Sequence, residues 1–416
     1  MKVLSVGALN VVFRGITMSA RLVLLVAMAR YLEPEQLGVF ALFSSANLWG
    51  LYLQGLEFHL FSARSLVGEP PASWARGRRD AFALYGTVFV AAAVVWTIVF
   101  FAGFLPWTLL PLFLLILAME HVAQESFRLL NMFERPLAGS VVLLARSGVW
   151  MYVVAFVIWR SPSARSLELV FGGWAVGAGV SVLLSLWFLR DLPWRGLGPI
   201  DWRWMKRGLA VSLPLLVGSL AFRGIALFER SWLGYVDGER SLGVFGFYAT
   251  IAGALSVLAE SGVGNVLYPR MLRAWKSGRK DDYRAASRSV WIAYGAFLLV
   301  GIPASAFAVT FLASHLGHPE YAASLDAYYV LLGAAGLTVA GAAAQYDLWA
   351  RGRDRTMIAA SVTGLIVAVV LGVVLIPRYG LLGAAWCDVG AAAAMLALRG
   401  GAVIALWRTG GVGSAQ

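Results

Sequence analysis

Phe13-Arg14-Gly15-Ile16 opens an apolar segment near the start of the chain, and Phe222-Arg223-Gly224-Ile225 opens a second one. In each segment a further arginine follows seven residues after the first, at Arg21 and at Arg230. Each segment then runs on into the same tetrapeptide, Leu37-Gly38-Val39-Phe40 or Leu242-Gly243-Val244-Phe245. This repetition predicts that the chain consists of two related halves.

A spacing of seven places two side chains on nearly the same face of a helix. An arginine at the centre of a bilayer costs roughly 3 kcal/mol, so four of them cost on the order of 10 kcal/mol. Arginines placed there at such a cost are expected to have a specific role. We expect the guanidinium groups to face a central cavity and to hold an anionic, lipid-linked substrate. One alternative is that the arginines pair with internal carboxylates and only hold helices together. Another, for Arg14 and Arg230, is that the side chain extends to the membrane–water interface. The substrate-binding candidates are Arg14, Arg21, Arg223 and Arg230.

The composition predicts an all-α polytopic membrane protein. Of the 416 residues, 60% are hydrophobic and only 13% are charged, which excludes an ordinary soluble domain. The apolar runs are too long for barrel strands, so helices must span the bilayer. The single cysteine, Cys387, excludes an intrachain disulfide framework and a cysteine-based metal cluster. Lys2 and Ala27-Met28-Ala29 resemble a signal peptide, but Arg14 and Arg21 interrupt its core, so we expect a retained helix.

Twelve spans of about 20 or more apolar residues are predicted. Their ranges are 8–32, 37–63, 81–104, 108–130, 138–159, 168–189, 209–233, 242–268, 288–312, 325–350, 356–377 and 381–407.

The basic residues predict the orientation of the chain. One side of the membrane holds only Arg30, Arg160, Arg165, Arg240 and Arg378, and the spans contain Arg14, Arg21, Arg146, Arg223 and Arg230. The other 24 of the 34 lysines and arginines, including Arg78, Arg128, Arg351, Arg399 and Arg408, fall on the opposite side. By the positive-inside rule both termini are cytoplasmic. The net charge of +12 is therefore an orientation signal, and we expect no nucleic-acid partner.

Two six-helix lobes are predicted, at 1–189 and 209–408, joined by a cytoplasmic linker at 190–208 and followed by a tail at 409–416. Ala123-Gln124 and Ala344-Gln345 repeat at an offset of 221, as do Ser140-Val141 and Ser361-Val362. The offset corresponds to six helices, an even number, so both halves have the same orientation. In such parallel repeats the substrate site lies between the halves near the midplane.

Acidic residues inside the predicted spans have two interpretations. They can bind H⁺ or Na⁺ and drive a transport cycle, or they can be charge partners of the arginines, which we favour. In the fourth span His121, Gln124, Glu125 and Arg128 share one helical face, but one histidine beside glutamates is weak evidence for a metal. No metal, other cofactor or catalytic residue is predicted. The acidic candidates are Glu57, Glu120, Glu125, Glu229, Glu260 and Asp347.

Three stretches resemble the flippases for O-antigen and polysaccharide in the multidrug/oligosaccharidyl-lipid/polysaccharide (MOP) exporter superfamily. The first runs from Ala29 to Phe40 (ARYLEPEQLGVF), around the first predicted outer loop. The second is Lys206–Leu215 (KRGLAVSLPL), at the start of the second half, and the third is Ile376–Ala385 (IPRYGLLGAA), between the last two spans. As a loose pattern, the similarity covers essentially the whole chain.

This resemblance implies two six-helix lobes in a V shape around a cationic cavity, in a bacterial cytoplasmic (inner) membrane. It implies alternating access that moves a polyprenyl-diphosphate-linked oligosaccharide from the cytoplasmic to the periplasmic leaflet, for assembly of O-antigen or exopolysaccharide. Membrane lipids, H⁺ or Na⁺, a polysaccharide polymerase and a chain-length regulator are the implied partners. The chain lacks the two extra helices of the lipid II flippases, and its predicted cavity is more basic than is usual in drug extruders.

Three alternatives to the flippase remain from the sequence. A cation-coupled small-molecule or drug exporter of the same fold would depend on Glu or Asp rather than on Arg. A membrane glycosyltransferase or polymerase would need an outer catalytic site, for which the short outer loops leave little room; Glu33-Pro34-Glu35 is better explained as a helix start. A major-facilitator transporter also has six plus six helices, but the repeat and the family-like loops disfavour it.

Overall fold

The computed structural model describes residues 2–66, 69–194 and 198–408, without the side chains of residues 2–11, 14 and 71. All secondary structure in these ranges is helical. The chain forms two compact units. The first comprises Met1–Glu33 and Leu42–Leu216, and the second comprises Pro34–Ala41 and Val217–Gln416. The lobes predicted at 1–189 and 209–408 remain a proposal.

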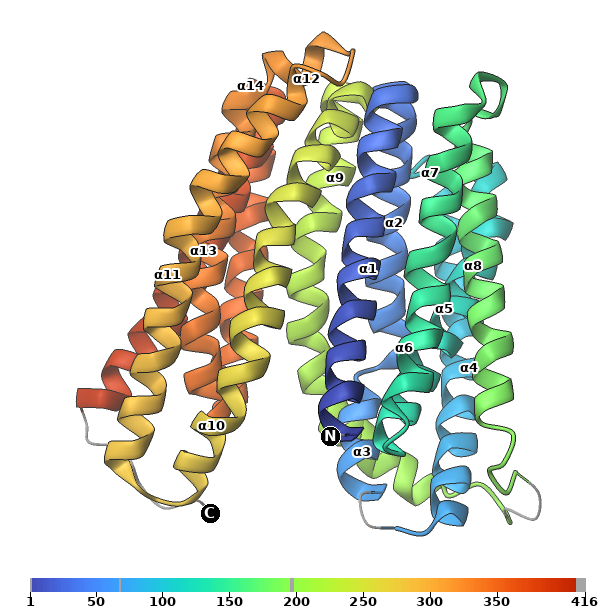
Figure 1. Ribbon diagram of the computed structural model, residues 1–416, viewed down its shortest axis with the longest axis vertical. Coiled ribbons are helices and arrows are strands. Elements are labelled where there is room, and N and C mark those ends of the chain that lie inside the picture. The colour runs from blue at the N-terminus through green and yellow to red at the C-terminus, as the bar shows by residue number, and fades with distance from the viewer. Residues whose placement is uncertain (1, 67–68, 195–197, 409–416) are drawn as a thin grey trace. The chain divides into compact units, whose positions relative to one another are not determined.

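In the first unit, α1 packs against α6, η2 and α7, and α5 packs against α6 and α8 (Figure 1). Proline begins α4 and α6, where its missing N–H costs nothing. At the start of α8, the Ser166 hydroxyl accepts a hydrogen bond from the Leu169 backbone N–H. The elements are α1 (Lys2–Tyr31), α2 (Pro34–Gly55), α3 (Phe58–Leu66), α4 (Pro71–Phe101), η1 (Trp107–Leu109), α5 (Leu110–Met132), α6 (Pro136–Leu144), η2 (Ala145–Val149), α7 (Trp150–Arg160), η3 (Pro162–Ala164) and α8 (Leu167–Phe188).

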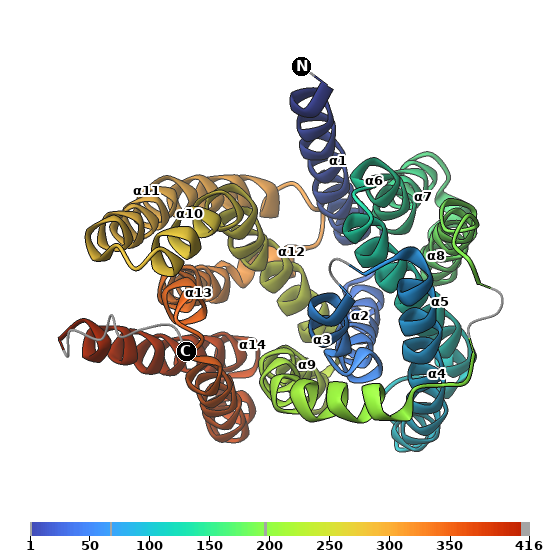
Figure 2. The same ribbon diagram turned by 90° about the horizontal axis from the view of Figure 1, so that it is seen from below.

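In the second unit, α13 lies between α11 and α14 and contacts both (Figure 2). The α9 helix begins in the first unit and continues into the second. The elements are α9 (Trp202–Ala259), η4 (Glu260–Gly264), α10 (Asn265–Lys276), α11 (Lys280–Ala313), α12 (Pro319–Ala323), α13 (Leu325–Ala350) and α14 (Asp354–Arg408).

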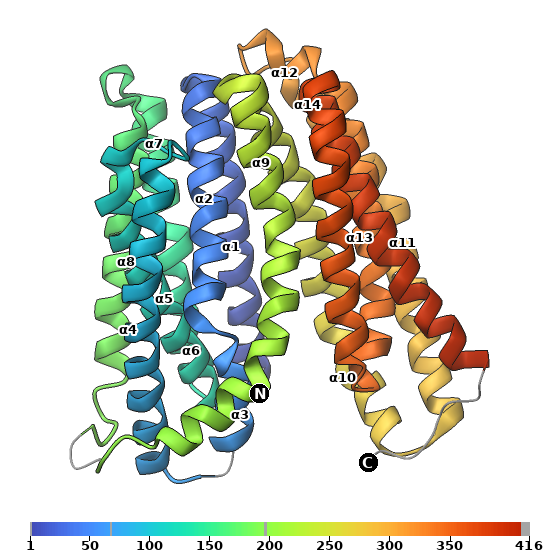
Figure 3. The same ribbon diagram turned by 180° about the vertical axis from the view of Figure 1, so that it is seen from behind.

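Two of these helices fold back on themselves at a glycine. In α14 the chain reverses at Gly380, whose φ is 53°, and the two arms are visible in Figure 3. In α9 the break falls at Gly238, whose φ is 88°. Positive φ is readily available only to glycine, so one residue makes each turn. The outer connections predicted near 234–241 and 378–380 are therefore almost entirely helical.

Outward-facing apolar side chains show that the chain is a multi-pass membrane protein. On α4, an exposed apolar stripe is formed by Val90, Val94, Ile98 and Phe101. Contact of such a stripe with water is unfavourable. Within the described residues, eight helical stretches have the length and composition of membrane spans, and two of them are the long folded-back runs 202–276 and 354–408. The number of twelve spans stays a prediction.

Two predicted spans have different bounds. The span predicted at 37–63 is interrupted, because α2 ends at Gly55 and Leu56 and Glu57 adopt φ values of 50° and 53° before α3 begins. Such values are uncommon for residues other than glycine and mark a constrained turn. The span predicted at 81–104 begins ten residues earlier, at Pro71, which places Arg78 inside a helix and not in a loop.

Candidate anion-binding and ion-coupling sites

Arg21 is an exposed cation on the α1 helix. Its guanidinium makes no hydrogen bond or ion pair with any residue that the structure describes, yet it lies within electrostatic range of Arg146 and Glu120. Thr17, one turn earlier on the same face, is buried against Gly148 of η2. Arg14 belongs to the α1 backbone, but its side chain lies outside the described residues.

Arg146 and Glu120 together connect η2, α5 and α8. The Arg146 Nε donates to Glu120 of α5, its Nη2 donates to Gln124 Oε1 at 3.1 Å, and Trp174 of α8 donates to Glu120 Oε1 at 2.9 Å. Arg146 lies in η2, a π-helical turn in which Ser147 departs from helical geometry at φ −139° and ψ 22°. Such turns reorient side chains within a helix and are frequent at functional sites.

The charges of this group do not cancel. Arg21 and Arg146 carry two positive charges, whereas Glu120 carries one negative charge, so one positive charge is left over. Glu120 accepts hydrogen bonds from Arg146 and from the Trp174 indole, and within the described part of the chain no hydrogen bond or ion pair joins it to Arg21. An anion bound at Arg21 would neutralise the remaining positive charge.

A second carboxylate in the first unit is fully enclosed by cations. Glu125 is 0% exposed; Arg78, itself 1% exposed, donates to it at 2.6 Å, and Arg128 and Tyr85 also donate to it. His121 is buried beside this group, in edge-to-face contact with Tyr85, and neither of its ring nitrogens has a hydrogen-bond partner among the described residues. These are the contacts of a charge partner that ties α4 to α5.

Glu57 lies at the constrained turn between α2 and α3. Its carboxylate is 3.4 Å from His59 Nδ1, in the same electrostatic network as Glu125 and Arg128. The turn therefore brings a third acidic candidate to the buried cluster of the first unit.

The second unit contains a comparable carboxylate on α13. Asp347 is buried and accepts hydrogen bonds from Tyr283, from Ser287 at 2.5 Å and from Arg351 Nε at 3.2 Å. As with Glu125, one cation comes from the next turn of the same helix and the other donors come from a neighbouring helix, here α11. The repeat seen in the sequence thus includes a repeated arrangement of buried charge.

Arg399 is a site residue that the sequence reasoning placed wrongly. We counted it among the basic connections between spans, but it lies within α14 and is 5% exposed. Its Nη1 donates to Gln345 at 3.0 Å, its Nε has no hydrogen-bond partner, and no carboxylate among the described residues pairs with it. Arg78 and Arg128 were likewise assigned to loops, but they lie within α4 and α5 and pair with Glu125. Arg351 follows the end of α13, as predicted, and pairs with Asp347. The burial of Arg399 could have been anticipated, because this residue lies inside the span predicted at 381–407.

Arg223 and Arg230 both lie on α9 and both are half-buried. The Arg223 guanidinium is 5.3 Å from the centroid of the neighbouring Phe222 ring. Arg230 donates weakly to the Ala226 carbonyl at 3.5 Å, and its buried Nε has no hydrogen-bond partner. It lies within electrostatic range of Glu229 and of Asp388, a residue of α14 that the sequence did not single out.

Glu229 of α9 and Asp388 of α14 interact electrostatically inside the second unit. Two neighbouring carboxyl groups repel each other when both are ionised, which favours a proton on one of them. The pair is therefore a place where a proton can be held. Glu260, in contrast, is exposed in η4. Among the described residues, no group of three or more His, Cys, Asp or Glu side chains has the arrangement of a metal site.

The fold is that of known transporters. One solved structure, the inward-facing conformation of a multidrug resistance MATE family transporter of the MOP superfamily, superposes with a TM-score of 0.74 at 14% identity, over 96% of this chain and 99% of that one. The chain has the MOP transporter fold. The structure of lipid II flippase MurJ in an inward closed conformation gives a TM-score of 0.58 at 12% identity, over 96% of this chain and 87% of that one.

A third MOP structure is described by its reversed pocket polarity. It is a MOP superfamily transporter from Pyrococcus furiosus, for which "reverse polarity of binding pocket suggests different function", with a TM-score of 0.56 at 15% identity over 99% of this chain and 94% of that one. No known family model matches the sequence, and no curated protein sequence matches it. At these sequence identities the structural similarity establishes only the fold. The function has to be inferred from the chemistry of the residues.

Proposed function

We propose that this protein is a flippase that moves a polyprenyl-diphosphate-linked oligosaccharide from the cytoplasmic to the periplasmic leaflet, for O-antigen or exopolysaccharide assembly. Both the multidrug transporters and the lipid II flippase share its fold, so the fold alone leaves the substrate open. The charge of the intramembrane side chains distinguishes the two classes, because a diphosphate needs fixed cations.

The observation that carries the proposal is the state of Arg21. It is exposed on α1, has no hydrogen-bond or ion-pair partner among the described residues, and lies within electrostatic range of a second arginine, Arg146. A guanidinium of this kind offers its planar fork to a phosphate through two parallel charge-assisted hydrogen bonds. Arg146 stays bound to Glu120 and raises the local positive charge.

The second unit contributes Arg223 and Arg230 in the proposal, and Arg14 assists from the first. Arg230 is more constrained than Arg21 because Glu229 and Asp388 lie close to it. We assign the anchoring of the diphosphate to Arg21 and Arg223, which lie nearest the middle of the spans predicted at 8–32 and 209–233, with Arg14 and Arg230 in supporting roles. No side chain of the protein is assigned a catalytic role.

A transport assay on reconstituted vesicles tests this assignment. The substrate is a fluorescent polyprenyl-diphosphate oligosaccharide, and an added lectin or oxidant reports how much of it reaches the outer leaflet. The double variant Arg21→Ala/Arg223→Ala should lose transport, whereas Arg30→Ala, in the last turn of α1, should keep it. Wild-type flipping by the double variant at equal protein density would remove the proposal.

One observation favours a second candidate, a cation-coupled exporter of small molecules. The Glu229–Asp388 pair can hold and release a proton, as a proton-driven exporter requires. This candidate predicts that Glu229→Gln abolishes efflux of a cationic dye driven by a pH gradient, while Arg21→Ala leaves efflux intact. A protein that exports no dye and still depends on Arg21 for glycolipid transport would exclude it.

A further inference from the structure

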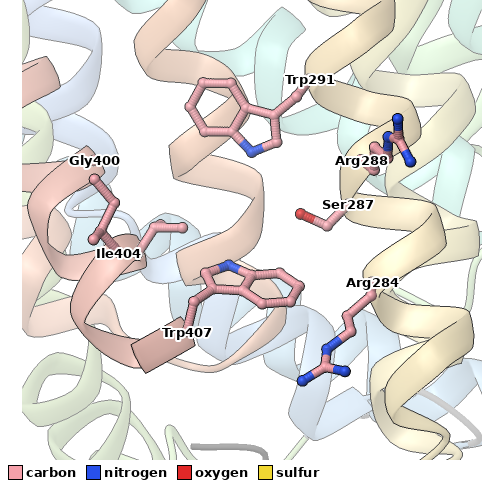
Figure 4. A pocket seen from close by; sticks show the side chains of 8 residues that line it. Arg284, Ser287, Arg288, Trp291, Gly400, Ile404 and Trp407 are labelled. Carbon is pink, nitrogen blue, oxygen red and sulfur yellow. The ribbon is translucent and has the colours of Figure 1, made fainter. Parts of the chain in front are cut away.

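A crevice of about 530 Å³ opens in the second unit between the first turns of α11 and the last turns of α14. Figure 4 shows the side chains of α11 on one side and those of α14 on the other. The lining includes Arg284, Ser287, Arg288, Trp291, Ile404 and Trp407.

The position of the crevice along α11 corresponds to a membrane surface. This helix has 34 residues, about 50 Å at 1.5 Å per residue, so it is longer than a hydrocarbon core of about 30 Å. Its continuous apolar run begins near Val290, and Arg288 and Arg284 lie two and six residues before it. Trp291 and Trp407 lie at the level where tryptophan collects between headgroups and acyl chains.

The polar end of the crevice has a surplus of positive charge. Arg288 is exposed and makes no ion pair or hydrogen bond with the part of the chain that the structure describes. Among the described residues, Arg284 forms an ion pair only with Asp281, at 3.7 Å, where both side chains are exposed, and its guanidinium is 6.0 Å from the Trp407 ring. The buried Ser287 hydroxyl already donates to Asp347. Two arginines are thus available to an anion.

The other end of the crevice is apolar and open. Ile404 is exposed, and a Cβ added to Gly400 would meet no atom within 4 Å. Contact with this apolar surface does not stabilise a free inorganic anion, whereas it stabilises a hydrocarbon chain that covers the surface. The required ligand is therefore amphipathic, with a negative head and an apolar tail.

We propose that this crevice binds one anionic phospholipid. The phosphate lies between Arg284 and Arg288, and one acyl chain follows α14 past Gly400 and Ile404. Basic pockets between transmembrane helices near the membrane surface bind anionic headgroups through this combination of charges. The site is separate from the intramembrane arginines of the proposed transport function and does not depend on it.

Native mass spectrometry of the detergent-solubilised full chain tests the site. Phosphatidylglycerol and phosphatidylcholine of matched acyl length are added at equal concentration, and the fraction of protein that retains one lipid is measured. Wild type should retain phosphatidylglycerol preferentially, and Arg284→Gln/Arg288→Gln should weaken retention on the order of tenfold. The matched control is Arg270→Gln/Arg273→Gln, which removes the same charge from exposed positions of α10 outside the crevice.

A steric pair of variants tests the acyl chain separately. Gly400→Leu fills the crevice without changing charge, whereas Gly401→Leu, which also meets open space, leaves the crevice lining unchanged. Retention should fall in the first and persist in the second, and glycerol 3-phosphate should not displace the lipid. The proposal is overturned if both charge variants lose lipid equally, if Gly400→Leu binds as wild type does, or if glycerol 3-phosphate competes fully.

Discussion

A Cβ atom added to Gly38 would lie 3.1 Å from the backbone nitrogen of Gly243, and one added to Gly243 would lie 3.1 Å from that of Gly38. Each would also overlap a carbonyl oxygen of the opposite segment, of Glu239 or of Pro34. The tetrapeptide Leu-Gly-Val-Phe that the chain contains twice thus packs against its own copy within the second unit. The glycines allow this approach of two backbones because they have no side chain.

Alanine at either glycine should destabilise the protein. The added methyl group meets backbone atoms that cannot rotate away, so we expect a loss of about 1–3 kcal/mol, with Gly243→Ala at the upper end. Thermal unfolding of the purified protein in detergent measures the effect. Gly253→Ala, on the same α9 helix but facing open space, is the control and should unfold at the wild-type temperature.

Removal of Glu125 should also be costly. Glu125→Ala leaves Arg78 buried without its carboxylate, and breaking a buried pair in this way costs about 3–5 kcal/mol. Arg128→Ala should cost less, since Arg128 is partly exposed and Glu125 keeps its contact with Arg78. Equal unfolding temperatures for wild type and Glu125→Ala would contradict the ion-pair account of this cluster.

The ion pair between Arg135 and Asp191 should make stability depend on acid pH. Hydrogen bonds from Arg135, at 3.0 and 2.5 Å, hold the pKa of Asp191 below its ordinary value of 3.8. A carboxyl with a lowered folded pKa stabilises fully above its unfolded pKa, and this contribution disappears as the pH falls through the folded pKa. Because both side chains are about half exposed, the contribution is below about 1 kcal/mol.

Unfolding temperatures measured from about pH 6 down to about pH 3 check this sign. The wild type should lose more stability over this range than Asp191→Asn, which cannot titrate at that position. Arg135→Gln should behave like Asp191→Asn. A steeper loss in the asparagine variant would mean that the carboxylate is not stabilised by Arg135.

The helices and the repeat could be predicted from the sequence, because apolar runs and duplicated motifs are local patterns. The repeated arginines and the Gly38 and Gly243 tetrapeptides were visible in this way. The reversal at Gly238 falls inside the connection predicted at 234–241, but the sequence did not show that a single residue makes the turn. A predicted loop was placed there instead.

The charge pairs could not be predicted, because they depend on which helices pack together. Arg78 and Glu125 are 47 positions apart, and nothing in either segment specifies the other. Asp388 was overlooked because it lies near the polar groups of α9 only after α14 has folded. Counting basic residues by loop likewise concealed Arg399, whose burial follows from the path of α14 along α13.

Equilibrium binding of a polyprenyl diphosphate to the purified protein tests the central claim most directly, since it measures the anchor without the rest of the transport cycle. Wild type should bind the diphosphate, and Arg21→Ala should bind it about 10–100-fold more weakly, the loss expected for a hydrogen bond to a charged group. Arg30→Ala should bind as wild type does. Unchanged binding by Arg21→Ala, with correct folding shown by its unfolding temperature, would contradict the account.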